Sequence, residues 1–508
     1  MMRTPIVLLA MSLGPVSASA QAGGPAPACD CQADLDSLAA KLERNYIAFR
    51  FEVAGKPRES AYRTLVARLH DRAASTSDAD CIHLLRELTD WFGDGHLFVF
   101  QWPAVTPEET ARLAAQAERR DIDEARVRAE LDRRKGRLDP IEGIWYAPGY
   151  RIGILREPTK GGPDFTAVVL QSDSAQWRPG QVKGRFWRNR DGSYRTIYAA
   201  DDHSRRDVTS RVYRNLLLTM SPVTWGRAYP LAPHEVGSLD PVDPTRPTVR
   251  LFGAEAVVVS VPSHDPKYRG VLDSLMAHHR AAITSRPYLV VDIRGDIGGG
   301  SLTTAAIVPF MVTKETRPPI GPSGASMVLS SPDNIAYFEQ GGWNPDSIAQ
   351  RMSAAPGQLL QLIRNETLGM PFPNDTVLPM PRKVGVLMDR GVASAGEAFA
   401  LQARKSTKVQ LFGENSYGMI DYQSVRVVRL ACRARGNLFG YPMIAASATL
   451  PKDGLNKEGV PVDVRIGRDV ADQVGWVLRA LRGPRRRASA APGRRAGSRP
   501  ACGRPSRA

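Results

Sequence analysis

The spacing of apolar residues divides the chain into a helical first part, a strand-rich middle and an alternating last part. Apolar residues recur at helical spacing in three early stretches, residues 33–47, 58–75 and 79–92. Between residues 137 and 250, short apolar runs alternate with Pro, Gly and Asp turns, which indicates antiparallel strands. From residue 251 onward strand-like and helix-like runs alternate, and this order predicts an α/β core.

These patterns predict six segments along the 508 residues. They are a signal peptide (1–20), an N-terminal helical region carrying His96 (21–105), a charged helix (106–136), an inserted antiparallel β module (137–250), an α/β core (251–482) and a disordered basic tail (483–508). We also expect a loop-rich insertion inside the core, at about residues 314 to 380.

The first 20 residues have the composition of a secretory signal. Arg3 precedes an apolar run from Ile6 to Val16, and small residues then lead to Ala20. We therefore expect cleavage after Ala20 and a periplasmic or secreted protein. The run is shorter than the ~20 apolar residues that cross a bilayer, and no later segment is long and uncharged enough, so we expect no membrane span.

Net charge is the one feature of the composition that raises the question of nucleic-acid binding. The formal charge is +16, but the tail after Gly483 holds eight arginines and no acid, which leaves +8 for the rest. The body of the chain has no zinc-finger, helix-turn-helix or basic-aromatic pattern. We therefore expect no nucleic-acid partner.

The five cysteines, at positions 29, 31, 81, 432 and 502, match neither zinc-ligand spacing nor a CxxC redox pair. We expect no metal site and no cofactor. In an exported chain Cys81 is expected to pair with Cys31 or with Cys29, and an odd number of cysteines leaves at least one thiol unpaired.

The segment from 383 to 402, KVGVLMDRGVASAGEAFALQ, carries the strongest chemical signal. An apolar strand leads to a tight turn with Ser394, and a helix of small residues follows. Such a turn exposes a serine hydroxyl, and a helix N-terminus supplies free N–H groups for an oxyanion. The sequence from Ser394 to Glu397 also fits a Ser-x-x-Glu capping box, so a helix cap is the alternative.

A second turn, in YLVVDIRGDIGGGSLTTA at residues 288–305, joins a buried strand to a run of three glycines. Glycines allow backbone N–H groups to approach a ligand closely. The turn lacks both the GxGxxG spacing and the Lys-Ser/Thr pair of phosphate-binding loops. A purely structural turn remains the alternative.

A base and an orienting acid can be sought among the histidines and the late carboxylates. Of eight histidines, only His96 and His264 lie at strand or turn junctions suited to a site. Glu458 precedes Gly459 in a turn before a strand, where an acid could orient a histidine. Taken alone, an exposed loop glutamate is the simpler interpretation of Glu458.

Five motifs in this order resemble the tail-specific or C-terminal processing serine peptidase family, which also includes the tricorn core. They are GDGH, VVDIRGDIGGG, GVASAGEAFALQ, GENSYG and KEGVPVDV. The resemblance implies peptide-bond hydrolysis in a crotonase-like (ClpP/crotonase) β-α spiral core. It assigns Ser394 as nucleophile, with an oxyanion hole formed by the N–H of Ala395 and that of Gly298 or Gly299.

The resemblance also bears on the base. The best-known branch takes a lysine from the loop that reads GENSYGM here, but Met419 occupies that position and a thioether cannot accept a proton. The tricorn-like branch implies His96 as base and Glu458 as its orienting acid. That branch often has a serine before the histidine, where this chain has Gly95.

The expected partner is an unfolded or tail peptide substrate, and the oligomeric state is left open. Two alternatives remain. One is a binding protein for peptides or apolar ligands on the same fold, as in the repeats of interphotoreceptor retinoid-binding protein. The other is a Ser/Lys peptidase that uses Lys405 or Lys408, although both lysines are expected to be solvated.

Overall fold

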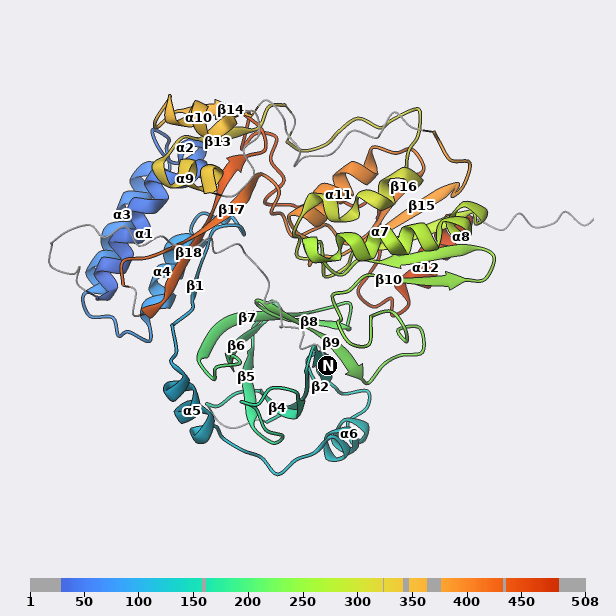
Figure 1. Cartoon of the computed structure of the whole chain (residues 1–508), viewed down its shortest axis with the longest axis horizontal. Helices are drawn as coiled ribbons and strands as arrows, with labels where there is room; N and C mark the ends of the chain where they lie inside the picture. Colours follow the sequence, from blue (N-terminus) through green and yellow to red (C-terminus); the bar gives the residue numbers. More distant parts are fainter. Residues whose placement is uncertain are drawn as a thin grey trace, which may run out of the picture.

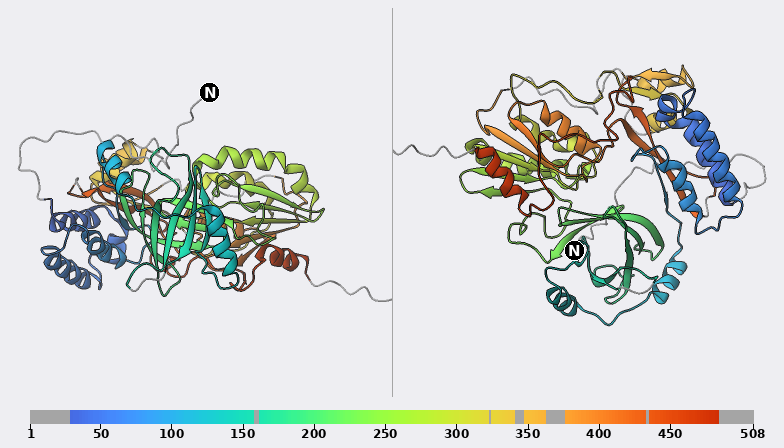
Figure 2. Two further views of the ribbon diagram at one scale, coloured as in Figure 1. Left: turned by 90° about the horizontal axis from the view of Figure 1, so that it is seen from below. Right: turned by 180° about the vertical axis from the view of Figure 1, so that it is seen from behind.

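The computed structural model describes residues 29–157, 161–322, 324–340, 347–362, 376–432 and 435–483. The expected signal peptide and the tail beyond Gly483 lie outside the described residues. Within the described ranges, none of the helices has the length and apolar character needed to span a bilayer. The protein is a mixed α/β structure built around two sheets and a barrel, seen from three sides in Figures 1 and 2.

The early apolar stretches form a bundle of four helices. They are α1 (Cys31–Asn45), α2 (Ile47–Glu52), α3 (Glu59–Ala73) and α4 (Cys81–Asp90). The side chain of Asp30 caps α1 by accepting from the Ala33 N–H. Buried apolar side chains from these helices pack on a five-stranded sheet and form one continuous core with it.

This five-stranded sheet is assembled from segments far apart in the sequence. Its strands are β1 (Phe98–Gln101), β13 (Met327–Leu329), β14 (Leu359–Gln361), β17 (Tyr422–Arg429) and β18 (Asn437–Ala445). The order is β1-β18-β13-β14, with β17 also on β18, and every pairing is antiparallel. Helices α9 (Pro332–Gln340) and α10 (Ile348–Ser353) complete this part.

Two stretches predicted within the 251–482 core therefore belong to the N-terminal helical part. The residues 327–361 contain helices and strands where a loop-rich insertion was expected. The reason is that β13 and β17 pair with β18, and β18 pairs with β1. One sheet therefore contains strands from the early and the late parts of the sequence.

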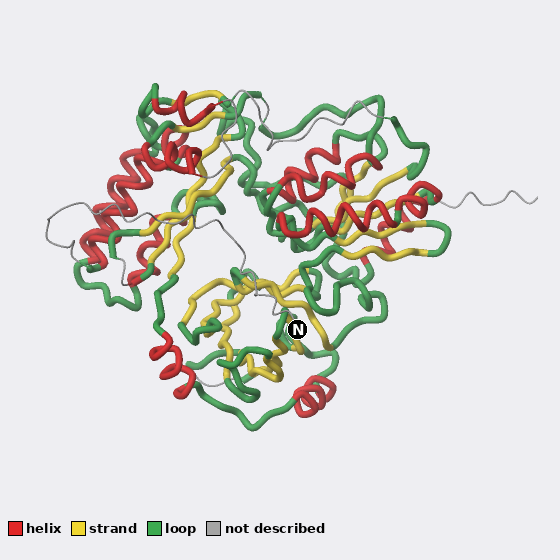
Figure 3. The backbone as a smooth tube through the Cα atoms, viewed as in Figure 1, coloured by secondary structure: helices red, strands yellow, loops and turns green. Residues whose placement is uncertain are grey.

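The strands of the middle segment close into an eight-stranded antiparallel barrel (Figure 3). They are β2 (Gly143–Ala147), β3 (Tyr150–Arg156), β4 (Phe165–Ser172), β5 (Val182–Arg188), β6 (Tyr194–Ala199), β7 (Arg205–Tyr213), β8 (Leu217–Met220) and β9 (Val223–Tyr229). Aromatic and β-branched side chains, among them Trp145 and Phe186, fill the interior. Closure pairs β2 with β9 and leaves no free edge.

The charged helix predicted over 106–136 is two helices, α5 (Pro107–Gln116) and α6 (Glu124–Arg133). Between them, Arg119 forms a bridge with Gln181, and the Arg120 N–H donates to the Gly180 carbonyl. The backbone here bonds to the barrel instead of continuing the helix.

The remaining strands form a six-stranded sheet with the order β10-β11-β12-β15-β16-β19. They are β10 (Thr248–Phe252), β11 (Ala256–Ser260), β12 (Tyr288–Asp292), β15 (Lys383–Met388), β16 (Val409–Gly413) and β19 (Val464–Arg465). All pairings from β11 to β19 are parallel, so their carboxyl ends share one edge of the sheet. The N-terminal end of α11 (Ala395–Arg404) follows the carboxyl end of β15 at this edge.

Helices cover both faces of this sheet, which explains its continuous apolar strands. The helices are α7 (Arg269–His278), α8 (Arg280–Ser285), α11 (Ala395–Arg404) and α12 (Gln473–Arg482), with 3-10 segments η1 (Pro266–Tyr268) and η2 (Ser301–Phe310). Leu272 and Phe399 pack on one face, and Val477 and Leu481 pack on the other.

Two disulfides tie the helical part together. Cys31 pairs with Cys81, one of the two alternatives left open by the sequence. Cys29 pairs with Cys432 and so joins the start of α1 to the segment between β17 and β18. Cys502 lies outside the described residues.

Candidate active site

Ser394 lies in the turn between β15 and α11, at the carboxyl edge of the parallel sheet. Its backbone has φ 52° and ψ −117°, a conformation that residues with a side chain rarely adopt. Strained backbone of this kind costs about 1–3 kcal/mol and persists only where the surroundings hold it. The sharp turn leaves Ser394 half-buried at the start of a buried helix.

The buried carboxylate of Glu397 holds this turn. It accepts the N–H groups of Ser394 at 2.8 Å, Met419 at 2.8 Å and Gly418 at 2.9 Å, and the hydroxyl of Ser416. Burial raises the pKa of Glu397, and these hydrogen bonds oppose the rise. The Ser-x-x-Glu pattern seen in the sequence therefore connects the serine turn to the 416–419 loop.

The backbone N–H groups expected to form an oxyanion hole belong to Ala395 and to Gly298 or Gly299. A Cβ on Gly298 would lie 2.8 Å from the Ser394 Cβ and 3.1 Å from the Ala395 nitrogen, so only glycine fits there. The Gly298 N–H donates to Asp296 at 2.9 Å. The N–H groups of Ala395 and Gly299 donate no hydrogen bond among the described residues. Of the two glycines predicted, Gly299 is the one with a free donor.

A buried histidine contacts the glycine loop, residues 293–300. His264 is fully buried, and its Nδ1 is bonded to the Asp296 carboxylate. Its Nε2 contacts the Thr304 hydroxyl at 3.2 Å, so both ring nitrogens are occupied. Asp296 in turn accepts the Ala393 N–H through its carbonyl at 2.9 Å. His264 therefore fixes the loop and is not placed to act as a base.

His96 is buried beside the serine turn, after the Gly-Asp-Gly motif. Its Nδ1 lies 2.6 Å from the Tyr422 carbonyl, which assigns the proton to Nδ1 and leaves Nε2 as the acceptor. The backbone N–H of His96 donates to the Asp94 carboxylate at 2.9 Å, and the Tyr46 hydroxyl donates to the same carboxylate at 2.8 Å. Burial lowers the pKa of His96, against smaller opposing effects of Tyr422 and Glu397.

The two parts of the chain that carry His96 and Ser394 meet at the 416–419 loop. A Cβ on Gly95 would lie 2.6 Å from the Met419 Cγ, which explains why this chain has glycine before the histidine. The Met419 N–H shares the Oε2 of Glu397 with the Ser394 N–H. No hydrogen bond joins the His96 ring to the Ser394 hydroxyl among the described residues.

Glu458 is not at this site in the role expected of it. Its carboxylate is exposed and makes no hydrogen bond or ion pair in the described part of the chain, and only its carbonyl is engaged, by the Asn415 amide at 3.2 Å. The Tyr422 carbonyl occupies the ring nitrogen of His96 that an orienting acid would bind. Sequence reasoning missed Tyr422 because backbone carbonyls carry no residue signature.

The two lysines considered as alternative bases lie away from Ser394. Lys405 caps the C-terminal end of α11, the end opposite Ser394. Lys408 donates to the Leu378 carbonyl at 2.9 Å. Across the described residues no cluster of three or more His, Cys, Asp or Glu side chains could hold a metal ion.

Part of the chain is similar to a known protein family. Residues 257–466 match the model of peptidase family S41. No curated protein sequence is similar enough to match the chain.

Solved structures with a similar fold include three proteases. The photosystem II D1 C-terminal processing protease is 14% identical over 89% of this chain and 96% of its own, with a TM-score of 0.33. Mature CPAF complexed with lactacystin is 10% identical over 89% and 98%, with a TM-score of 0.43. The tricorn protease is 12% identical over 89% of this chain and 37% of its own, with a TM-score of 0.36.

Proposed function

Because residues 257–466 form a peptidase family S41 domain and the chain is a serine peptidase, we propose that it cleaves peptide bonds with Ser394 as nucleophile and His96 as base. The observation that carries the proposal is the strained backbone of Ser394 at the N-terminal end of α11, where the Ala395 N–H has no acceptor among the described residues. Such a turn is the arrangement by which a serine hydroxyl attacks a carbonyl.

In the proposed reaction the Ser394 hydroxyl attacks the scissile carbonyl and passes its proton to Nε2 of His96. The N–H groups of Ala395 and Gly299 bind the oxygen on which negative charge develops. The protonated His96 then gives its proton to the leaving amine, and water hydrolyses the acyl ester with His96 again as base. The Tyr422 carbonyl keeps the ring in the tautomer that this sequence of transfers needs.

The substrate proposed is an unfolded peptide or chain terminus with apolar side chains. Three apolar residues near the turn are unusually exposed: Ile297 at 50%, Leu302 at 36% and Tyr417 at 43%. An extended chain without its own fold can place side chains on such residues while its backbone reaches Ser394.

Export is also proposed. The two disulfides, Cys31–Cys81 and Cys29–Cys432, support it because such bonds persist in oxidising compartments. We further propose a crotonase-like spiral for the core. The parallel strands from β11 to β19, with helices on both faces, support that class.

Hydrolysis of a fluorogenic unstructured peptide by the full chain tests the function. Ser394→Ala is expected to abolish turnover, and Ser406→Ala is the matched control. Ser406 is a buried serine at the far end of α11, and it should keep wild-type turnover because it lies away from the site. Persistent turnover by a folded Ser394→Ala protein rejects Ser394 as the nucleophile.

A binding protein without turnover is the second candidate. It is favoured by the exposed carboxylate of Glu458 and by the missing hydrogen bond between His96 and Ser394. The two candidates differ in whether Ser394 reacts covalently, since a binding protein does not activate a nucleophile.

A further inference from the structure

One hairpin of the barrel reaches both loops of the proposed site. The turn between β7 and β8 packs the Tyr213 side chain against the glycine loop and against residues 389–395, the serine loop. A Cβ on Gly295 would lie 3.2 Å from the Tyr213 Cβ and 2.9 Å from a methyl of Leu217, and one on Gly391 would lie 2.7 Å from the Tyr213 ring. Both glycines are thus required by the approach of this hairpin.

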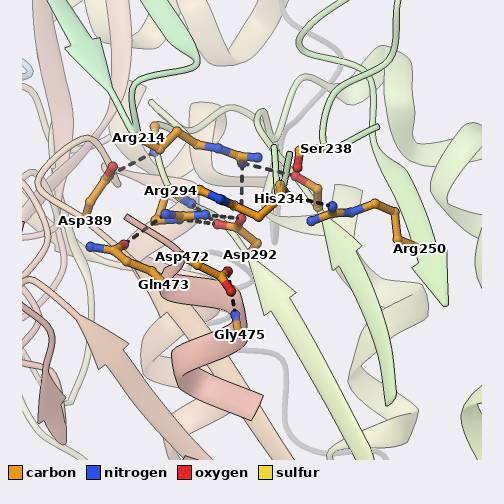
Figure 4. Close-up of polar contacts among 12 residues, drawn as sticks. Arg214, His234, Ser238, Arg250, Asp292, Arg294, Asp389, Asp472, Gln473 and Gly475 are labelled. Carbon is orange, nitrogen blue, oxygen red and sulfur yellow. Dashed lines mark hydrogen bonds and ion pairs between the residues drawn. The ribbon is translucent and has the colours of Figure 1, made fainter. Parts of the chain in front are cut away.

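The next residue of the turn, Arg214, enters the carboxyl edge of the six-stranded sheet (Figure 4). Its side chain is 1% exposed, its guanidinium lies 3.3 Å from the Asp292 carboxylate, and it donates to the Ser260 hydroxyl at 3.2 Å. Arg214 and Asn215 have φ of 45° and 56°. Two left-handed residues in a row form a tight turn that projects the arginine out of the barrel.

Asp292, the last residue of β12, connects this arginine to the glycine loop. Arg294 contacts the Asp292 carboxylate through Nε at 2.8 Å and Nη2 at 2.7 Å. Although burial opposes it, the guanidinium groups of Arg214 and Arg294 hold the pKa of Asp292 well below its usual range. Arg294 also bonds Gln473 of α12 at 2.9 Å, so three parts of the chain meet at one carboxylate.

A second carboxylate ties the two loops to each other. The Oδ1 of Asp389 accepts the Gly295 N–H and the Gly391 N–H, each at 2.9 Å. Gly295 lies in the loop that contains Gly299, and Gly391 begins the turn that presents Ser394. The relative position of donor and nucleophile is therefore set where Tyr213 and Arg214 dock.

We propose that the turn Tyr213–Arg214 is a positioning element for the reaction: the barrel inserts Arg214 beside Asp292 and so fixes the spacing between the glycine loop and the serine loop. The barrel is then part of the catalytic apparatus and not only an appended module. The kinetic part of this proposal rests on the proposed function of Ser394. The structural part, the ordering of two loops by one arginine, does not.

The test compares Arg214→Met and Arg214→Lys with Arg206→Met in the full chain. Arg206 is the matched control because it is a buried arginine on the same strand, β7, but at its other end, 4.5 Å above the Trp102 ring. Two quantities are measured: kcat and KM for the fluorogenic peptide, and amide hydrogen exchange in segments 293–300 and 389–395. Exchange reports how firmly the loops are held whether or not the protein cleaves peptides.

Arg214→Met is expected to lower kcat by about tenfold or more with KM within about twofold, because substrate contacts remain while the oxyanion geometry loosens. Exchange in both segments should accelerate by about tenfold or more. Arg214→Lys, which keeps the charge but loses the fork geometry, should be intermediate. Arg206→Met should resemble the wild type in both quantities.

Unchanged exchange in the two segments of a folded Arg214→Met protein overturns the proposal, whatever its rate of cleavage. If Arg214→Met does not fold, Arg214→Lys decides the question by the same criterion. Failure of the proposed function has a separate signature, since turnover would then survive in Ser394→Ala. In that case exchange still tests the ordering of the loops.

Discussion

Replacement of Glu397 by glutamine gives the sharpest energetic test of how the serine turn is held. In the wild type each carboxylate oxygen accepts two hydrogen bonds: Oε2 from the N–H groups of Ser394 and Met419, and Oε1 from Gly418 and the Ser416 hydroxyl. Glutamine has one oxygen and one NH₂ group. With the NH₂ group towards Ser394 and Met419, two N–H donors face a donor. With the NH₂ group towards Gly418 and Ser416, the Gly418 N–H faces a donor, while the Ser416 hydroxyl can rotate to accept.

The magnitude follows from the one or two hydrogen bonds that are lost. Hydrogen bonds to a charged group contribute about 1.5–3 kcal/mol each, so Glu397→Gln should lower the free energy of unfolding by about 1.5–6 kcal/mol. One of the two pairs includes the N–H that holds the strained Ser394. If only about 2.7 kcal/mol of this loss appears in the transition state, kcat/KM falls about 100-fold.

Urea unfolding followed by tryptophan fluorescence, together with peptide turnover, measures both effects. Glu414→Gln is the control, because Glu414 makes a surface ion pair with Arg468 at 2.8 Å, and such pairs contribute about 0–1 kcal/mol. A free energy of unfolding for Glu397→Gln within about 1 kcal/mol of the wild type, together with an unchanged rate of peptide turnover, would contradict this role of Glu397.

Three further predictions follow from other residues. The free energy of unfolding of Ser394→Gly, measured by thermal melts, should exceed that of Ser394→Ala by about 1 kcal/mol or more, because glycine relieves the left-handed strain. Equal stability would show that the backbone is unstrained. Burial raises the pKa of Asp389 to about 6, so the stability gained by protonating this carboxyl is present below pH 3.8 and lost as pH rises through 6. The Oδ1 of Asn can still accept both N–H groups, so Asp389→Asn should be up to about 3 kcal/mol more stable to unfolding than the wild type at pH 8. Lower stability of Asp389→Asn at pH 8 would contradict burial as the origin of the pKa shift. Since burial lowers the pKa of His96 below the ordinary histidine value of 6.5, kcat/KM should fall on the acid side with an apparent pKa below that value, and an apparent pKa above 7 in the pH profile would exclude His96 as the base.

The chemical elements of the site were predicted from local patterns. Ser394 and the glycine loop each follow the end of a strand, and His96 lies in the turn between α4 and β1. A turn is a short-range feature that residues such as Gly and Asp specify directly. Two interpretations of Ser394, as a helix cap and as a nucleophile, describe the same turn, because Glu397 binds the Ser394 N–H.

Features that depend on distant pairing could not be predicted. The sheet that carries β1 takes its other strands from residues beyond 326, and no local signal specifies which strands will pair. The disulfide between Cys29 and Cys432 follows from the same assembly. The partner of the His96 ring depends on the same kind of pairing: the Tyr422 carbonyl, brought in by β17, binds the ring nitrogen for which Glu458 was expected.

The arginine at the barrel turn was equally hidden. Arg214 has no sequence feature that separates it from the many other arginines of this basic chain, and its burial depends on the contact of the barrel with the six-stranded sheet. The sequence of the glycine loop does show the consequence, because Gly295 and Gly391 are needed where the hairpin approaches.

Covalent labelling by a fluorophosphonate probe, with peptide mapping, is the most direct test of the central claim that Ser394 is a nucleophile activated by His96. We expect a single label on Ser394 in the wild type and labelling about 100-fold slower or more in His96→Ala, since general-base catalysis contributes about 10²–10⁴-fold. A wild-type protein without label on Ser394, or a His96→Ala protein that is labelled there at the wild-type rate, would contradict it.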